Sequence, residues 1–147
     1  SNPAIDIVTS DGLPLGCNVK SFSRGAMQKV LAAYRTDKND TGFADFFTKT
    51  GLCNHVVIDP TGPEHIHDTA RLTLDYDFDL ELFRRIFEAL YRDGEVFGLD
   101  AVVDVLNRNP DWLDLNSHIN EEYWQRHGEK SDLQFEDSDG TVKQVVS

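Results

Sequence analysis

Hydrophobic and polar positions change their spacing repeatedly along the chain, so strands and helices are expected to alternate. Alternating or short apolar runs predict strands at 5–10, 18–22, 54–59 and 71–74. Apolar residues three or four positions apart predict helices at 24–34, 43–50, 80–91, 99–106 and from 110 onward. The segment that ends before Pro60 contains three consecutive apolar residues at 56–58 and is expected to be a buried strand. This alternation is typical of an α/β fold.

Residues at the ends of the expected helices support these boundaries. Ser23 is a suitable N-cap for the helix at 24–34, because its hydroxyl can accept a backbone N–H bond. The expected buried face of this helix consists of Met27, Val30, Leu31 and Tyr34. Gly51 is placed to end the short helix before it. Asn109 and Pro110 form an N-cap and first-turn pair for the last helix.

The length and the tail set the expected domain organisation. A chain of 147 residues is about one domain long. We expect residues 1–127 to form that domain and residues 128–147 to form a polar, acidic tail. The tail either pairs as a hairpin about Asp139 and Gly140 or remains loose. The chain starts at Ser1 and its only methionine is Met27, which suggests a piece of a longer protein.

Three aspartates, Asp75, Asp77 and Asp79, gather where the last predicted strand meets the helix at 80–91. Ligands of α/β proteins bind beyond the carboxyl ends of strands, where Asp75 stands. A carboxylate there can hold Mg²⁺, which prefers oxygen ligands and often bridges to substrate phosphates. Alternatively, Asp77 or Asp79 serves only to cap the helix. Arg71 would orient Asp75 or an anionic group, or would form a surface ion pair worth little.

Composition and charge exclude several classes of partner. The net charge of -12 argues against a nucleic-acid surface and against an anionic membrane surface, both of which need clustered lysine and arginine. No apolar run approaches the roughly 20 residues that span a bilayer. The two cysteines, Cys17 and Cys53, are too few for a disulfide scaffold, so a reduced, cytoplasmic location is expected.

A second metal hypothesis comes from one cysteine and three histidines. Cys53 and His55, and again His65 and His67, are two positions apart, which places each pair on one face of a strand. Structural zinc sites usually have spacers of two to four residues instead. The alternative is that the segment between the pairs is an ordinary turn.

The segment RLTLDYDFDLELFRRIFEALY, residues 71–91, resembles the C-terminal motif of sugar cytidylyltransferases. It is most similar to the spore-coat-polysaccharide-biosynthesis branch, relatives of the acylneuraminate and 3-deoxy-manno-octulosonate enzymes. That branch reads R-[LW]-T-[VL]-D-T-P-E-D-[FL]-E-L before a helix. The matching residues are Arg71, Thr73, Asp75, Asp79 and Glu81. Tyr76 and Asp77 replace the Thr-Pro pair of the family, and Asp77 could take over the capping task.

The resemblance covers roughly residues 6–125. The segment VFGLDAVVDVLNRNPDWLDLNSHINEEY is similar to the closing helices of the family, with its Asn-Pro pair and its L-N-x-H-I motif. Upstream, GCNVKSFSRGAMQKVLAAY is similar to a segment G-L-D-V-E-V-F followed by a helix. Gly16, Val19 and Phe22 match there, whereas Asn18 and Lys20 replace an acidic pair and reverse the local charge.

The resemblance implies the C-terminal portion of a nucleotide-diphospho-sugar transferase-like (GT-A-like) mixed sheet with flanking helices. It implies CMP transfer from CTP to a sugar, with Mg²⁺ held by Asp75, Arg71 orienting an anion, and Asn18 and Lys20 facing the sugar. The sequence has no glycine-rich basic loop for a triphosphate, so we expect no activity from this chain alone. The competing hypothesis is a non-catalytic oligomerisation or scaffolding module. A half-domain would expose an apolar face, so a homo-oligomer is expected.

Overall fold

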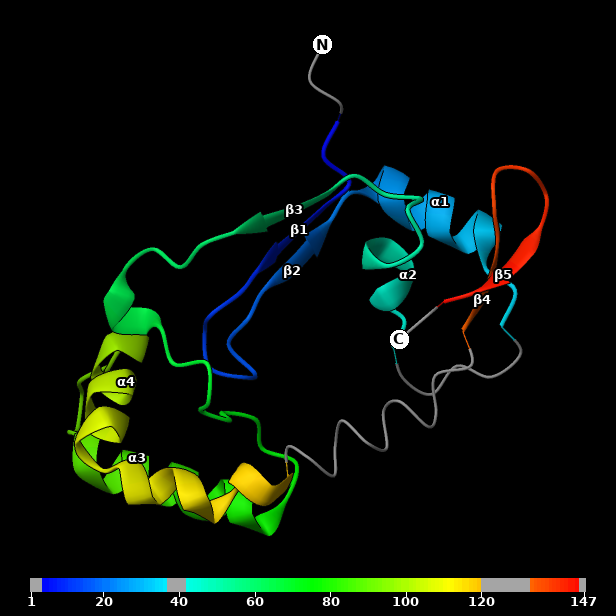
Figure 1. The fold of residues 1–147 in the computed structure, drawn as a ribbon. Helices are drawn as coiled ribbons and strands as arrows, with labels where there is room; N and C mark the ends of the chain where they lie inside the picture. The colour runs from blue at the N-terminus through cyan, green and yellow to red at the C-terminus, as the bar shows by residue number, and fades with distance from the viewer. Residues whose placement is uncertain (1–3, 37–41, 120–132, 146–147) are drawn as a thin grey trace. The chain divides into compact units, whose positions relative to one another are not determined.

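The computed structural model describes residues 4–36, 42–119 and 133–145 (Figure 1). The chain forms two compact units. Unit 1 comprises Ser1–Thr9, Val19–Ile58 and Tyr123–Ser147, and unit 2 comprises Ser10–Asn18 and Asp59–Glu122. The mixed α/β class is confirmed, since a small mixed sheet, several helices and a hairpin are present. No helix among the described residues has the length and apolar character needed to cross a membrane.

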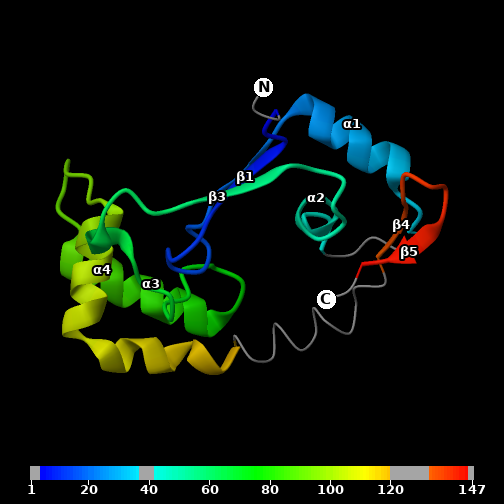
Figure 2. The same ribbon diagram turned by 45° about the horizontal axis from the view of Figure 1, so that its top comes forward.

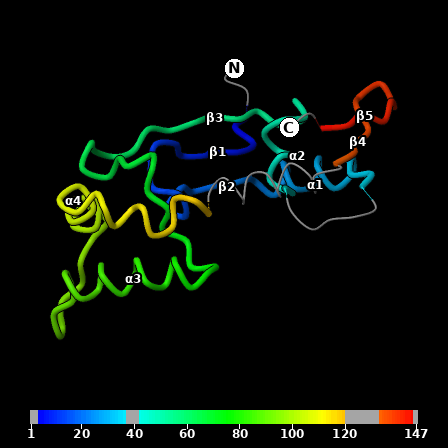
Figure 3. The backbone as a smooth tube through the Cα atoms, turned by 60° about the horizontal axis from the view of Figure 1, so that its bottom comes forward, coloured from blue at the N-terminus to red at the C-terminus, as the bar shows by residue number. Residues whose placement is uncertain are grey.

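Unit 1 contains a three-stranded sheet in the order β2-β1-β3 (Figure 3). The strands are β1 (Ile7–Ser10), β2 (Lys20–Phe22) and β3 (His55–Ile58). β1 is antiparallel to β2 and parallel to β3. The prediction that β3 is buried is wrong, because Val57 is 55% exposed and Ile58 is 49% exposed. β3 is also the last strand on its side of the sheet in the described part of the chain.

The helices of unit 1 are α1 (Arg24–Ala33) and α2 (Asp45–Thr48). The predicted N-cap is confirmed, because the Ser23 hydroxyl accepts a hydrogen bond from the Ala26 N–H at 3.0 Å. The predicted buried face of α1 is partly wrong. Ala26, Val30 and Ala33 are the buried residues, and Leu31 is 58% exposed. Alanine is only weakly apolar, so the hydrophobic spacing did not identify Ala26 and Ala33 as buried positions.

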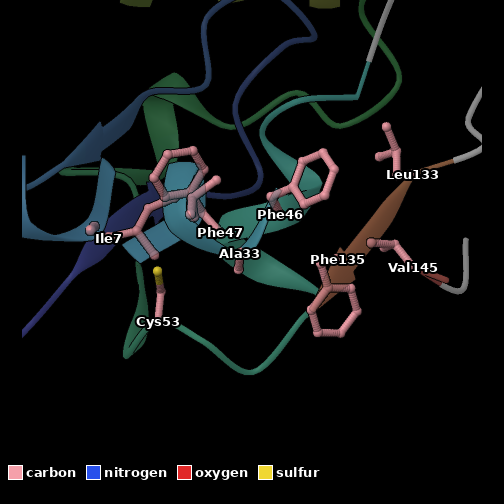
Figure 4. Close-up of a cluster of buried hydrophobic side chains, with 10 residues drawn as sticks. Ile7, Ala33, Phe46, Phe47, Cys53, Leu133, Phe135 and Val145 are labelled. Carbon is pink, nitrogen blue, oxygen red and sulfur yellow. The ribbon is translucent and has the colours of Figure 1, made fainter. Parts of the chain in front are cut away.

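The tail of the chain pairs as a hairpin. Its strands are β4 (Gln134–Glu136) and β5 (Val142–Gln144), which are antiparallel around the turn that contains Asp139 and Gly140. Figure 2 shows the hairpin beside α1 and α2. Leu133, Phe135 and Val145 are buried in the same apolar cluster as Ile7, Val30, Phe46 and Phe47 (Figure 4). The hairpin therefore contributes side chains to the core of unit 1.

A buried carboxylate joins three segments of unit 1. Asp6 accepts hydrogen bonds from the Lys29 ammonium at 2.7 Å and from the Asn54 N–H at 2.9 Å. The hydrogen bond from Lys29, and then that from Asn54, hold the pKa of Asp6 below its ordinary value. Asp6 thus links β1 to α1 and to the start of β3.

Because the folded-state pKa of Asp6 is lowered, its ionised form should stabilise unit 1 at neutral pH. The contribution should be lost as the pH falls through the folded pKa, which lies below the ordinary value of 3.8. Urea unfolding of the wild type and of Asp6→Asn should therefore converge at acid pH and differ most near neutrality. Lys29→Gln should show the same convergence. A difference between wild type and Asp6→Asn that stays constant down to strongly acid pH would contradict this account.

The described part of unit 2 consists mainly of helices and short 3₁₀ segments. They are η1 (Pro63–His65), α3 (Asp77–Leu90), α4 (Leu99–Arg108) and η2 (Pro110–Leu115). The fully buried residues of its core are Ala70, Leu82, Ile86 and Leu106. The helices predicted at 80–91 and 99–106 are confirmed, with α3 starting three residues earlier. The helix predicted from Pro110 is a 3₁₀ segment, and the Asn109 side chain donates to the Val105 carbonyl instead of capping it.

The strand predicted at 71–74 is absent. Arg71 forms one parallel bridge with Leu15, and the backbone continues without a strand to α3. The Leu15 carbonyl accepts a hydrogen bond from the Leu72 N–H at 2.7 Å, and Gly16 follows with φ of 99°. A Cβ on Gly16 would lie 2.5 Å from the Leu72 carbonyl oxygen. Only glycine therefore allows this close approach of the two segments.

Candidate functional site

The start of α3 is capped by Asp79, the third of the three aspartates. Its Oδ2 accepts hydrogen bonds from the backbone N–H groups of Asp75 at 3.0 Å and Tyr76 at 3.1 Å. Asp79 is fully buried, although a carboxylate at this position of a helix usually faces solvent. Asp77 is the first residue of α3 and is exposed. The capping role that we expected from Asp77 or Asp79 thus falls to Asp79.

Arg71 lies beside this buried carboxylate. Its side chain is 1% exposed, its Nε donates to Asp79 Oδ1 at 3.0 Å, and its Nη2 donates to Asp75 Oδ2 at 2.8 Å. Its guanidinium carbon lies 5.8 Å from the centre of the Tyr76 ring, within the range of a cation–π contact. The alternative that Arg71 forms a weak surface ion pair is therefore wrong.

Asn116 completes the network from a distant part of unit 2. Its Nδ2 donates to Asp79 Oδ1 at 2.8 Å and to the Arg71 carbonyl at 3.1 Å. The residue is buried and directly follows η2. Sequence reasoning did not single out Asn116. The signal that could have identified it is its place in the L-N-x-H-I motif, where a polar residue stands between apolar ones.

Hydrogen bonds determine the charge state of the buried group. Burial by itself would raise the pKa of Asp79. Hydrogen bonds from the Arg71 side chain, the Asp75 backbone and the Asn116 side chain outweigh burial and lower this pKa below its ordinary value. Asp79 is therefore ionised at neutral pH. Arg71 with the two carboxylates of Asp75 and Asp79 has a net charge of about -1, which favours a cation beside Asp75.

Asp75 is the member of this network that reaches solvent. Its side chain is 55% exposed, whereas those of Arg71 and Asp79 are almost completely buried. Two residues earlier, the hydroxyl of Thr73 is buried and has no hydrogen-bond partner within the described structure. An orphaned buried hydroxyl is uncommon and can mark a position where a ligand or water supplies the missing bond.

The other two residues predicted to bind substrate, Asn18 and Lys20, belong to different units. Asn18 belongs to unit 2, where its side chain donates to the Leu13 carbonyl at 3.1 Å and accepts from the Ser10 hydroxyl at 3.3 Å. These bonds use the amide to hold its own loop. Lys20 is exposed on β2 in unit 1. The structure therefore brings together Arg71 and Asp75 but assigns Lys20 to the other unit.

Two exposed rings flank the start of α3. Tyr76 replaces a threonine of the resembled motif and is 40% exposed. Phe78 is also exposed, and its ring packs edge to face on His118 with the ring centres 4.9 Å apart. Tyr76 directly follows Asp75 in sequence, and Phe78 lies in the first turn of α3.

The metal-ligating side chains of the described residues determine which metal ion the chain could hold. The described residues contain no group of three or more cysteine, histidine or acidic side chains that could hold a metal ion. His65 and His67 instead contact the hydroxyls of Thr61 and Thr69 at 3.2 Å and 3.3 Å. Zinc therefore finds no closed ligand set there. Mg²⁺ commonly binds through one or two carboxylates together with waters and substrate phosphates, so the donor chemistry of Asp75 fits it.

Comparisons with known proteins do not add to this geometry. No family model, no curated protein and no solved structure matches the chain.

Proposed function

We propose that this chain is part of a nucleotidyltransferase that activates a sugar by Mg²⁺-dependent transfer of CMP from CTP. The observation that supports this proposal is the state of Asp75, an exposed carboxylate held by a buried arginine. It lies in the segment that resembles the metal-binding motif of sugar cytidylyltransferases. Thr73, which also matches the motif, adds a buried hydroxyl that has no hydrogen-bond partner among the described residues.

Arg71 and Asp75 would act together at this site. The Nη2–Oδ2 bond restricts the rotation of the Asp75 carboxylate, which retains acceptor capacity on both oxygens. A group that hydrogen-bonds to a metal-binding carboxylate orients it, and loss of that group lowers the affinity for the metal. Asp75 would hold Mg²⁺, which when bound would supply Lewis-acid polarisation of a phosphoryl group. Arg71, because it is already paired with two carboxylates, would position Asp75 rather than bind substrate itself.

The resemblance implies that Asn18 and Lys20 face the sugar. Lys20 has an exposed ammonium that could bind an anionic sugar, and it replaces an acidic residue of the resembled family. Asn18 would contribute by shaping its loop, because its amide is already hydrogen-bonded there. The nucleotide would be received by a different part of the parent protein, since a glycine-rich basic loop does not occur in this sequence. We infer that this chain alone does not turn over CTP.

In the full-length parent, Asp75→Ala should lower pyrophosphate release from CTP by about 100-fold or more, because the loss of metal stabilisation costs several kcal/mol in the transition state. The assay would contain Mg²⁺ and a panel of sugar acids. Asp77→Ala is the matched control, since it removes the same charge two residues away from an exposed position, and it should retain activity. A parent that keeps normal Mg²⁺-dependent turnover without Asp75 would show that the metal assignment is wrong. Turnover of CTP by the isolated chain that is lost in Asp75→Ala would support the metal assignment. It would contradict only the inference that the nucleotide site is missing from this chain.

A second candidate function is a non-catalytic oligomerisation or scaffolding module. The observation that favours it is the exposed apolar residues of β3, Val56, Val57 and Ile58. Exposed apolar strands at a sheet edge promote association, and a homo-oligomer would cover them. The charge of the chain still disfavours nucleic acid and anionic membranes as partners under either proposal, and both are compatible with a cytoplasmic protein. A parent with no CTP turnover and no dependence on Asp75 would leave this candidate in place.

A further inference from the structure

We propose that Asp79 and Asn116 are positioning residues for Asp75, acting through the guanidinium of Arg71. This inference rests on the function proposed for Asp75 and adds the residues that would fix its geometry. None of the three supporting side chains would touch substrate, because all are buried. Their common task would be to hold one solvent-exposed carboxylate in a single orientation.

The hydrogen bonds form a chain that leads from the core of unit 2 to its surface. Asp79 holds Arg71 through two contacts, from Nε at 3.0 Å and from Nη2 at 3.4 Å. Two parallel contacts fix the plane of the guanidinium as well as its position. Nη2 of the same guanidinium then reaches Asp75 at 2.8 Å. The orientation of Asp75 therefore depends on a group that lies eight residues away from Arg71 in sequence.

Asn116 holds both partners of the hydrogen bond between Arg71 and Asp79. Its single amide nitrogen donates to the Asp79 carboxylate and to the main-chain carbonyl of Arg71. On the neighbouring residue, the Leu72 N–H is bound by the Leu15 carbonyl. The backbone that carries Arg71 is thus held by two partners from other segments. Rotation of the Asp79 carboxylate or a shift of residue 71 would break a bond to Asn116.

A purely structural role does not explain the hydrogen bond from Arg71 to Asp75. Capping α3 requires only the hydrogen bonds that Asp79 accepts from the backbone N–H groups of Asp75 and Tyr76. A buried ion pair is weak evidence for stability, because desolvation offsets its attraction and an apolar pair can often replace it. An ion pair to a half-exposed carboxylate contributes little either. The bond from Arg71 to Asp75 is therefore better explained as control of the exposed carboxylate.

The direct test measures the side-chain rotamer of Asp75 by NMR in this chain. Three-bond couplings from the Asp75 Cγ to the backbone nitrogen and carbonyl should show one χ1 rotamer in the wild type. In Asp79→Asn and in Asn116→Ala, these couplings should take values averaged over more than one χ1 rotamer of Asp75. Asp77→Asn is the charge-matched control, and Ile86→Val is a core control that destabilises unit 2 without touching the network. Both controls should keep the single rotamer.

The second readout uses Mn²⁺ as the probe for the metal. Paramagnetic broadening of the Asp75 amide signal should require about 10-fold more Mn²⁺ in Asp79→Asn and Asn116→Ala, as for other outer-shell partners of ligands. It should be unchanged in Asp77→Asn and in Ile86→Val. Should Asp79→Asn fail to fold, Asn116→Ala decides the question, because it removes a neutral partner and leaves the ion pair.

The outcomes separate this inference from the proposed function. A single Asp75 rotamer in folded Asn116→Ala and Asp79→Asn would overturn the positioning role. Averaged rotamers with unchanged Mn²⁺ broadening would also overturn it, because the orientation would then have no consequence for a cation. Broadening that is absent in the wild type, or that survives Asp75→Ala, would instead refute the metal role of Asp75. In that case the rotamer measurement alone would still decide whether Asp79 and Asn116 position this carboxylate.

Discussion

Asp79→Ala is expected to lower the free energy of unfolding of unit 2 by about 3–5 kcal/mol, the cost of removing one partner of a buried ion pair. The change leaves the buried Arg71 guanidinium without its main partner. It also removes the acceptor for the N–H groups of Asp75 and Tyr76 at the start of α3. Hydrogen exchange of the α3 and α4 amides, measured as a function of urea, reports this change where it occurs.

Two matched variants make the expectation specific. Asp77→Ala should cost about 1 kcal/mol or less, because an exposed first-turn acid contributes only its interaction with the helix dipole. The double variant Arg71→Met/Asp79→Leu should recover much of the loss, because it replaces the buried charges with apolar groups. Equal costs for Asp77→Ala and Asp79→Ala would show that the Arg71–Asp79 pair contributes no more than an ordinary cap. A double variant that is no more stable than Asp79→Ala would show that the unpaired guanidinium is not the main cost of removing Asp79.

The helices of unit 2 could be predicted because their apolar spacing is long and regular. α3 and α4 present residues such as Leu82, Ile86 and Leu106 to one core, so the period determines their existence. The start of α3 was harder to place, since it depends on one side chain that folds back on the backbone. Asp79 does so, and α3 therefore begins three residues before the apolar pattern does.

The strands were predicted less well for a physical reason. A strand is stabilised by partners that are distant in sequence, and a short apolar run does not state whether those partners exist. Residues 71–74 have strand-like alternation, but Arg71 forms a single bridge because its side chain turns into an ion-pair network. β3 forms as predicted, yet its apolar residues are exposed, and a short apolar run does not indicate whether another layer covers it.

The composition of the candidate site was predicted, but the burial of its centre was not. The spacing of Arg71, Asp75 and Asp79 indicated a functional cluster at the start of a helix, and the structure brings these three together. The sequence could not indicate that Arg71 is the buried centre of the cluster, since arginine is rarely buried without partners. Asn116 was missed because it lies 45 residues from Arg71, and only the packing of η2 brings its amide to the network.

Phe46→Ala is expected to destabilise unit 1 by about 3–5 kcal/mol, the usual cost of replacing a buried aromatic residue by alanine. Phe46 is fully buried, and its ring lies 5.0 Å from that of Tyr34 and 5.9 Å from that of Phe43. α2 spans only Asp45–Thr48 and has no side-chain N-cap bond, so it depends on this packing rather than on its own propensity. Hydrogen exchange of the α1 and α2 amides should become faster throughout unit 1.

Leu31→Ala provides the matching control for this prediction, because the sequence pattern and the structure disagree about Leu31. The sequence places it on the buried face of α1, where its loss would cost about 2–5 kcal/mol. The structure exposes 58% of it, which predicts a change within about 0.5 kcal/mol. A large loss for Leu31→Ala together with a small loss for Phe46→Ala would show that α1 packs through the face that the sequence pattern predicted. The opposite result would confirm that Ala26, Val30 and Ala33 form the buried face and that the α2 phenylalanines fill the core beside it.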